Sequence, residues 1–487
     1  MNKKILGLAL TSVFAVTALA SCNKDDGKIH IKFWYSFGKS AEEPLLDQIK
    51  KFEEIYPEYK VDVVSKGGYD NLKKAISLEV STGNFPDVTL GYPDHVAEYL
   101  SADIVVPLDD YMNSEDPEIG IGEGAHNAKN DFLPNYMEEN RQYDEKGTTY
   151  GLPFNKSTEL MYYNKTVFDH YNVKVPTTWK EFEETGNKLQ SLVEADIKAG
   201  KVVKTADGKT LDWSALKDQK ATPVRSYTYD SSANALITLI RDFGGTYTKV
   251  GDSIEKGTIE FDSAETREAL NMLVRMRDNR SFSIPNFWES KYASDLFVKL
   301  QTFLTVGSSA GAKHNLPKDG AFEVGVAPIP FNDSLENNAG KNVIQQGTNL
   351  MMLDAHDDVE IKTGAWKLIR FLTAYQDEET GYDPNVQFAI GASYLPVRQS
   401  GLDSEAYKTF MNDTAGTDQD KIVRASAKKA MEYDSTWNKF TDPAFVGSSV
   451  VRTKAGEVIP AVIVAEKSVD EAIKACYDSL PAYHNKK

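Results

Sequence analysis

The sequence predicts an α/β protein with two domains. Residues 29–90 alternate strand, helix, strand, helix and strand, a spacing typical of a parallel sheet with helices on its faces. The chain has 487 residues and 41% hydrophobic content, more than one core requires, because single cores stop growing near about 250–300 residues. Residues 151–168 join a turn, an extended apolar run and a helix start, which indicates a crossing between the two domains.

The alternating pattern also predicts where a ligand binds. We expect strands at residues 29–35, 59–65 and 85–90, with helices at 40–56 and 69–81 between them. Ligands of such sheets lie off the carboxyl ends of the strands. The residues that follow the strands, 36–38, 67–69 and 91–94, are therefore the first candidates. Further along we expect a strand at 342–353, a helix at 359–375 and a mostly helical C-terminal third.

Composition excludes some functions. The chain has 55 Lys and Arg against 72 Asp and Glu, a formal net charge of −17, which argues against a nucleic-acid partner because phosphates would be repelled. The seven histidines show neither H-x-H nor H-E-x-x-H spacing, so we predict no metal site and no cofactor.

The N-terminus predicts export. Lys3 and Lys4 precede a short apolar core at residues 5–20, and Leu19-Ala20-Ser21-Cys22 has the form of a lipoprotein processing box. We expect residues 1–21 to be a signal peptide and 22–28 a tether lipidated at Cys22 and anchored to the cell membrane. The alternatives are an ordinary signal peptide or a short membrane anchor. Cys476 is the only other cysteine, which predicts that the exported protein has no disulfide.

Five segments, in order, resemble one family. They are the lipoprotein box, GNFPDV at 83–88, GLPFNKSTELMYYNK at 151–165, VPTTWKEF at 175–182 and GAWKLIRFL at 364–372. With them the chain resembles the extracellular solute-binding proteins of ABC importers, in the branch of maltose-type and glycerol-3-phosphate-type receptors. The resemblance implies a two-lobe periplasmic-binding-protein fold that closes on its ligand like a Venus flytrap, with hinge crossovers and a helical C-terminal region.

The resemblance also implies how the chain divides into two lobes and what the protein does. The N-terminal lobe is expected at residues 29–156 plus 332–374, and the C-terminal lobe at 157–331 plus 375–487. The protein is expected to be a monomer, not an enzyme, that captures a sugar or a glycerol-3-phosphate-like polyol outside the cytoplasmic membrane. It would deliver this solute to its ABC permease.

The finer resemblance is to the glycerol-3-phosphate-binding receptors, and it implies a set of ligand contacts. That subgroup has an acidic residue directly after the Tyr that ends strand three, whereas here Tyr92 is followed by Pro93 and only then by Asp94. Aromatic faces suit polyol C–H groups, and an Arg fork suits phosphate. The implied contacts are Tyr69, Asp94, Ser157, Ser309 with Ser308 as the alternative, Gly347, Tyr394 and Arg452.

Four alternatives stay open. Gly307 to Gly311 matches the G-x-S-x-G pattern of a serine ester hydrolase with Ser309 as nucleophile. A surface adhesin would instead present an exposed apolar patch and no closed cleft. Arg398 competes with Arg452 for the phosphate role, and Asp94 can be a plain helix N-cap.

Overall fold

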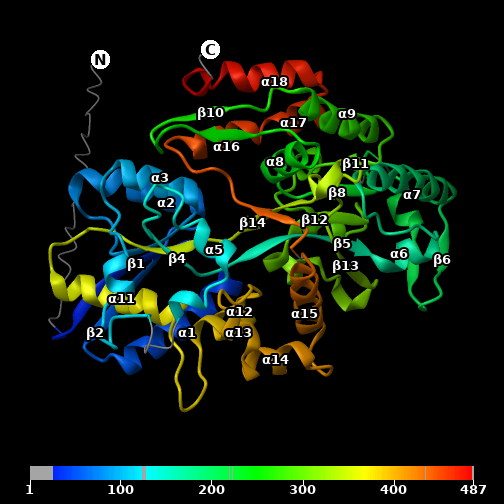
Figure 1. Ribbon diagram of the computed structural model, residues 1–487. Helices are drawn as coiled ribbons and strands as arrows, with labels where there is room; N and C mark the ends of the chain where they lie inside the picture. The colour runs from blue at the N-terminus through cyan, green and yellow to red at the C-terminus, as the bar shows by residue number, and fades with distance from the viewer. Residues whose placement is uncertain (1–25, 123–127, 219, 222, 434, 485–487) are drawn as a thin grey trace, which may run out of the picture.

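The computed structural model describes residues 26–122, 128–218, 220–221, 223–433 and 435–484. Two separate sheets organise this part of the chain, one on each side of Figure 1. The predicted signal peptide and Cys22 lie outside the described residues. We refer to the elements around the five-stranded sheet as the first lobe and those around the seven-stranded sheet as the second lobe.

The first lobe has the predicted parallel core. Its sheet has the strand order β2-β1-β3-β15-β4, in which β1 runs parallel to β2 and β3, and β15 runs antiparallel to β3 and β4. Phe33 and Leu90 are fully buried in it. The strands are β1 (Ile29–Tyr35), β2 (Tyr59–Ser65), β3 (Val88–Gly91), β4 (Leu152–Pro153) and β15 (Asn349–Met352), and the helices are α1 (Lys39–Ile55), α2 (Tyr69–Glu79), α3 (Pro93–Ser101), α4 (Asp109–Met112), α5 (Pro134–Glu138) and α11 (Val359–Thr373).

The second lobe is built on a sheet with the strand order β11-β8-β12-β5-β14-β16, and β13 also pairs with β5. Its strands are β5 (Ser157–Asn164), β8 (Tyr227–Tyr229), β11 (Phe282–Ser283), β12 (Leu304–Ser308), β13 (Val324–Pro328), β14 (Asn342–Gln346) and β16 (Asn438–Phe440). Two small hairpins pair β6 (Val202–Lys204) with β7 (Thr210–Asp212), and β9 (Thr248–Val250) with β10 (Gly257–Ile259).

Helices cover this second sheet and fill the C-terminal third of the chain, as predicted. Trp179 and Trp213 are among the large side chains buried in the core beneath them. The helices are α6 (Lys165–His170), α7 (Trp179–Ala199), α8 (Ser232–Asp242), α9 (Ala264–Asp278), α10 (Ala293–Phe297), α13 (Gln399–Asp403), α14 (Glu405–Asn412), α15 (Asp418–Met431), α16 (Ser448–Ala455), α17 (Val458–Ile463) and α18 (Val469–Asp478).

Two segments differ from the expected division. The strand predicted at 342–353 is split at Gly347 and Thr348, so β14 pairs with β5 in the second sheet and only β15 joins the first. The helix α12 (Pro384–Ala392), expected in the second lobe, packs against α1, and its Phe388 belongs to the first lobe's core, where it stacks on Phe154. The first lobe therefore resumes at β15 rather than at residue 332, and it extends past residue 374 to include α12.

The two lobes meet at a pair of crossover segments, residues 154–156 and 347–348. The Thr348 backbone N–H and hydroxyl both donate to the Asn155 side chain, at 3.2 and 2.5 Å. Gly347 has φ +92, and an added Cβ would lie 1.7 Å from the Asn155 carbonyl oxygen. Only glycine fits this approach, because other residues need both the space and a permitted backbone conformation.

Candidate ligand-binding site

A cavity of about 880 Å3 lies between the lobes, and we call it the central cavity. Helices α2, α3, α8 and α16 all contribute residues of their first turns, and β14 supplies its C-terminal end. Helix N-termini carry free N–H groups and a partial positive charge, so several of them favour an electron-rich ligand. The lining includes Tyr69, Asp70, Tyr92, Asp94, His95, Glu139, Asp230, Ser231, Ser232, Asn234, Gln345, Gln346, Gly347, Asp442, Ser449, Arg452 and Glu457.

The first lobe lines the cavity with aromatic rings. Tyr69 begins α2 just after β2, and Tyr92 caps α3 just after β3. Their rings meet edge to face with centroids 4.9 Å apart, and the Tyr92 ring also meets His95 at 5.8 Å. Burial raises the pKa of both tyrosines, so they remain neutral hydroxyl groups. This first wall can stack on the C–H faces of a polyol while its hydroxyls form hydrogen bonds.

Asp94 lies on the same wall but not at the position of a cap. The helix α3 begins at Pro93 with Tyr92 as its N-cap, which puts Asp94 inside the first turn. Its carboxylate accepts the His95 backbone N–H at 3.1 Å. The N-cap alternative for Asp94 is therefore wrong, because the proline occupies the first helical position and shifts the helix start.

The second lobe lines the cavity with a hydrogen-bonded network centred on Arg452. The Arg452 guanidinium donates to the Asp442 carboxylate and to the Asn234 side-chain oxygen. The Asn234 amide in turn donates to Glu159 at 2.7 Å, and the Tyr229 hydroxyl donates to the second Glu159 oxygen at 2.5 Å. Because Glu159 holds the amide N–H2, the oxygen of Asn234 faces Arg452.

Glu159 is 1% exposed, and this burial has an electrostatic consequence. Burial raises the pKa of Glu159 to about 7, although the hydrogen bonds from Tyr229 and Asn234 and the charge of Arg452 oppose the rise. A carboxylate in a site of low dielectric needs such donors to remain ionised. The orientation of Arg452 therefore depends on a group that titrates near neutral pH.

A buried ion pair lies behind the cavity at the crossover. Lys156 is fully buried and forms an ion pair with Glu139, which also accepts from Gln345 at 2.5 Å and from Asn349 at 2.8 Å. Burial lowers the pKa of Lys156, and the Glu139 carboxylate opposes this. The pair links a first-lobe loop to both crossover segments, so it fixes the relation of the two walls.

The lobes also touch at the rim of the cavity. The Ser449 hydroxyl, on α16 of the second lobe, donates to Glu98 at 2.5 Å, and the Lys73 ammonium donates to Ser449 at 2.5 Å. Lys73 and Glu98 are themselves 3.1 Å apart and lie on α2 and α3 of the first lobe. These contacts join α2 and α3 of the first lobe to α16 of the second at the rim of the cavity.

Four of the predicted contacts line the cavity: Tyr69, Asp94, Gly347 and Arg452. Tyr394 lies behind them, where its ring stacks on Phe388 at 5.7 Å. The three predicted serines lie close together, with Ser157 and Ser309 buried and Ser308 partly exposed. The Ser308 hydroxyl donates to Ser157 at 3.3 Å, and the Ser309 hydroxyl accepts the Thr158 backbone N–H at 3.2 Å. Contact of Tyr394 and these serines with a ligand remains a prediction.

The surroundings of Ser309 do not suit a nucleophile. The residue is 4% exposed, and among the hydrogen bonds of the described residues none joins its hydroxyl to a histidine. Arg398 does not suit a phosphate contact either, since it is 1% exposed and forms ion pairs with Asp383 and Asp131. The central cavity likewise differs from the adhesin alternative, which predicted no closed cleft.

Sequence reasoning missed several lining residues. Asn234 and Ser231 belong to the N-terminal turn of α8, and Asp442 follows β16. The signal that could have found Ser231 is its place as an N-cap after a short strand. Asp442 has no comparable signal, because its place depends on the parallel pairing of β16 with β14, about 96 residues away along the chain.

Neither metal binding nor membrane crossing has support in the described residues. No group of three or more His, Cys, Asp or Glu side chains there could hold a metal ion. No helix in the same residues has both the length and the apolar character needed to cross a membrane.

The fold and the cavity define a two-lobe receptor that encloses a small solute. Residues 47–415 match the model of the bacterial extracellular solute-binding protein family, and the chain belongs to this family. Members of the family are receptors and not enzymes, so the protein is the solute-binding component of an ABC transporter. The two-lobe fold and the receptor function predicted from the sequence are confirmed, and the hydrolase alternative is wrong.

Individual relatives agree with this assignment. The chain is 26% identical over 407 residues to the sn-glycerol-3-phosphate-binding periplasmic protein UgpB of Salmonella typhimurium, covering 81% of each chain. UgpB of Mycobacterium tuberculosis in complex with glycerophosphocholine has a TM-score of 0.68 at 17% identity, covering 94% of this chain and 99% of that one. The substrate-binding protein Lmo0181 of Listeria monocytogenes in complex with cycloalternan has a TM-score of 0.67 at 17% identity, covering 93% and 98%. These structural likenesses establish the fold.

Proposed function

We propose that the protein captures a small polyhydroxylated solute, a sugar or a glycerophosphate, in the central cavity and delivers it to an ABC permease. The glycerophosphate is the better fit of the two. It has an anionic end for Arg452 and hydroxyl groups for the carboxylates and tyrosines. The relative named for sn-glycerol-3-phosphate supports the same ligand class.

The observation that supports this proposal is the chemical contrast between the two walls of the central cavity. Arg452 and the first turns of α8 and α16 offer N–H donors and positive charge on one wall. Tyr69 and Tyr92 offer ring faces on the other. Asp442 forms an ion pair with Arg452, so an incoming phosphate has to compete with that carboxylate for the guanidinium.

The test is isothermal titration calorimetry with sn-glycerol-3-phosphate, a glycerophosphodiester and maltotriose. We expect Arg452→Ala to weaken binding of the phosphate ligands by about 100-fold, because it removes a charged hydrogen-bonding group from a partly enclosed site. Binding of maltotriose should change little. Arg275→Ala is the matched control, since Arg275 is an exposed arginine of the second lobe whose partner Glu183 is remote from the cavity.

Two results would count against the proposal. An unchanged affinity for sn-glycerol-3-phosphate in Arg452→Ala would exclude the phosphate role of this residue and leave a neutral sugar as the ligand. If none of the three solutes binds the wild-type protein, small polyhydroxylated solutes are excluded as its ligand class.

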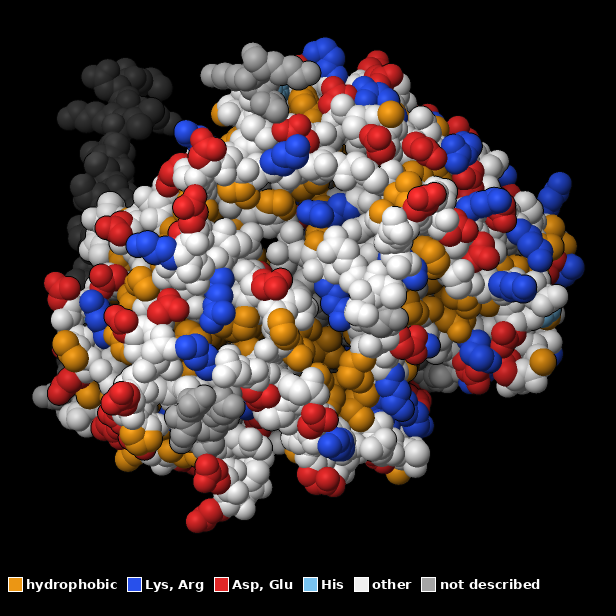
Figure 2. Space-filling model, in the orientation of Figure 1, with side chains coloured by type: hydrophobic (Ala, Val, Ile, Leu, Met, Phe, Trp, Pro, Cys, Tyr) orange, Lys and Arg blue, Asp and Glu red, His pale blue; other side chains and the backbone are white. Residues whose placement is uncertain are grey.

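The membrane attachment and the monomeric state belong to the proposal as well. The lipoprotein box ending at Cys22 supports a lipid anchor, with residues 22–28 as a tether. On the face shown in Figure 2, acidic and basic side chains are interspersed, which favours a monomer. Labelled palmitate should be incorporated into the wild type and not into Cys22→Ser; equal labelling of both proteins would contradict the anchor.

A further inference from the structure

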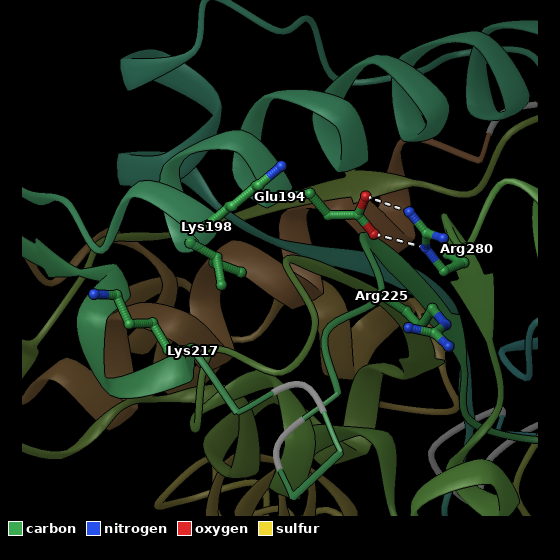
Figure 3. A pocket seen from close by; sticks show the side chains of 6 residues that line it. Glu194, Lys198, Lys217, Arg225 and Arg280 are labelled. Atoms are coloured by element: carbon green, nitrogen blue, oxygen red, sulfur yellow. Dashed lines mark hydrogen bonds and ion pairs between the residues drawn. The ribbon is translucent and has the colours of Figure 1, made fainter.

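A second cavity lies in the second lobe, away from the central cavity, at the C-terminal end of α7. Its volume is about 470 Å3. Figure 3 shows the side chains arranged around it, with Arg225 and Arg280 on one side and Lys198 and Lys217 on the other. We call it the basic pocket, and its lining residues are Glu194, Ile197, Lys198, Lys217, Arg225 and Arg280.

The lining is strongly positive in a chain of net charge −17. Four cations surround a single carboxylate, Glu194. Both oxygens of that carboxylate accept from Arg280, at 2.9 and 2.7 Å, as the dashed lines in Figure 3 show. Glu194 also accepts from Gln190 at 2.9 Å. The one carboxylate is therefore committed to Arg280, and three cations of the lining remain for another anion.

Of these three cations, Arg225 gives the strongest evidence for an anion site. Its side chain is half-buried, lies over the Phe287 ring at 4.5 Å and donates to the Val224 carbonyl at 2.8 Å. Among the ion pairs of the described residues, none joins Arg225 to a carboxylate. Burial lowers the pKa of Arg225, and the nearby charge of Arg280 lowers it further. The ring and the carbonyl thus hold a guanidinium in place without neutralising it.

A purely stabilising role explains only some of the cations of the basic pocket. Lys198 lies in the last turn of α7, where a cation stabilises the helix dipole. The end of the Lys217 side chain, including its ammonium group, lies over Gly200, the C-cap of the same helix. Both lysines therefore have a role without a ligand. Arg225 precedes β8 and does not belong to a helix end, so the helix dipole gives no reason for it.

We propose that the basic pocket binds a phosphate-bearing anion, as a second site that is independent of the solute in the central cavity. A guanidinium fork fixed by an aromatic face presents its free N–H groups to a tetrahedral oxyanion. The two lysine ammonium groups, on flexible stems, supply the further charge that a phosphate dianion requires. The anion can be a soluble phosphate compound or the headgroup of an anionic lipid, since both present the same group.

The first experiment is calorimetry with pyrophosphate on the intact mature protein. We expect binding by the wild type and a loss of about tenfold or more in affinity for Arg225→Ala, because a charge-assisted bidentate contact is removed. Arg275→Ala removes an arginine that is paired with Glu183 and should bind like the wild type. The pyrophosphate binding that Arg225→Ala removes should persist in Arg452→Ala, which alters only the central cavity, and this separates the two sites.

The second experiment distinguishes the sources of the phosphate group. Sedimentation with vesicles of phosphatidylglycerol and phosphatidylcholine, set against pyrophosphate binding, identifies a lipid headgroup or a soluble phosphate as the better ligand. Either one, if dependent on Arg225, supports the proposal. No binding of either, or binding that is lost in Arg452→Ala but kept in Arg225→Ala, overturns it. If Arg225→Ala does not fold, the exposed double variant Lys198→Ala/Lys217→Ala provides the same comparison.

Discussion

The two walls of the central cavity are held in different ways. The first wall consists of rings that pack on one another, Tyr69 on Tyr92 and Tyr92 on His95. The second wall is a chain of hydrogen bonds that runs from Glu159 through Asn234 to Arg452. Both walls face the same ligand space, so the difference concerns how each would recognise a solute.

The two walls therefore recognise different properties of a solute, its shape at the rings and its hydrogen-bonding groups at the network. Ring faces attract any apolar C–H surface and tolerate a range of ligand shapes. A network of satisfied buried hydrogen bonds instead fixes each donor and acceptor, and an unsatisfied member is costly. We therefore expect the first wall to set how a polyol stacks, and the second wall to decide which end of the ligand enters.

The strongest test of the comparison is the pH dependence of the second wall. The pKa of Glu159 in the folded protein is about 7, against 4.5 for the ordinary group. Between these values the folded state holds a proton that the unfolded state has lost, so this group makes stability fall as pH rises from about 4.5 to about 7. Glu159→Gln cannot lose a proton. Its free energy of unfolding, relative to the wild type, should rise by up to about 3 kcal/mol across that window.

Urea unfolding of both proteins at several pH values from 4.5 to 8 measures this difference. Above pH 7 the difference should become constant, because Glu159 is then ionised in both states. Glu145→Gln, at an exposed position outside the network, serves as the control and should follow the wild-type profile closely. A constant difference between Glu159→Gln and the wild type across the whole range would show that the second wall is not held by a buried titrating group.

The first wall was the part of the site that the sequence could predict. Tyr69 and Asp94 follow the second and third strands of a regular strand-helix alternation, and in a parallel sheet the residues after such strands share one edge. The alternation is local, so each element is readable from its own residues. The strand and helix order of the first lobe was predicted for the same reason.

The second wall could not be predicted in this way. Its sheet order places β8, β12, β5 and β14 side by side, out of chain order, and the place of Asn234 depends on that order. The resemblance to known receptors supplied Arg452 but not its partners Asn234 and Asp442. The segment 342–353 was predicted as one strand, and its division at Gly347 follows from the contact with Asn155, which lies far away in the sequence.

The smallest expected effect lies on the first wall, at the Tyr69 hydroxyl. Tyr69→Phe keeps the ring and its edge contact with Tyr92, and removes only a hydroxyl that accepts from Asn155 at 3.3 Å. We expect ligand affinity, measured by calorimetry, to change by about threefold or less, because a long neutral hydrogen bond contributes under about 1 kcal/mol. Tyr69→Ala removes the ring and should weaken binding by about tenfold, since aromatic contacts contribute more than the hydroxyl. If the Phe variant instead loses as much affinity as the Ala variant, the first wall also recognises its ligand through directed hydrogen bonds, and the two walls do not differ in kind.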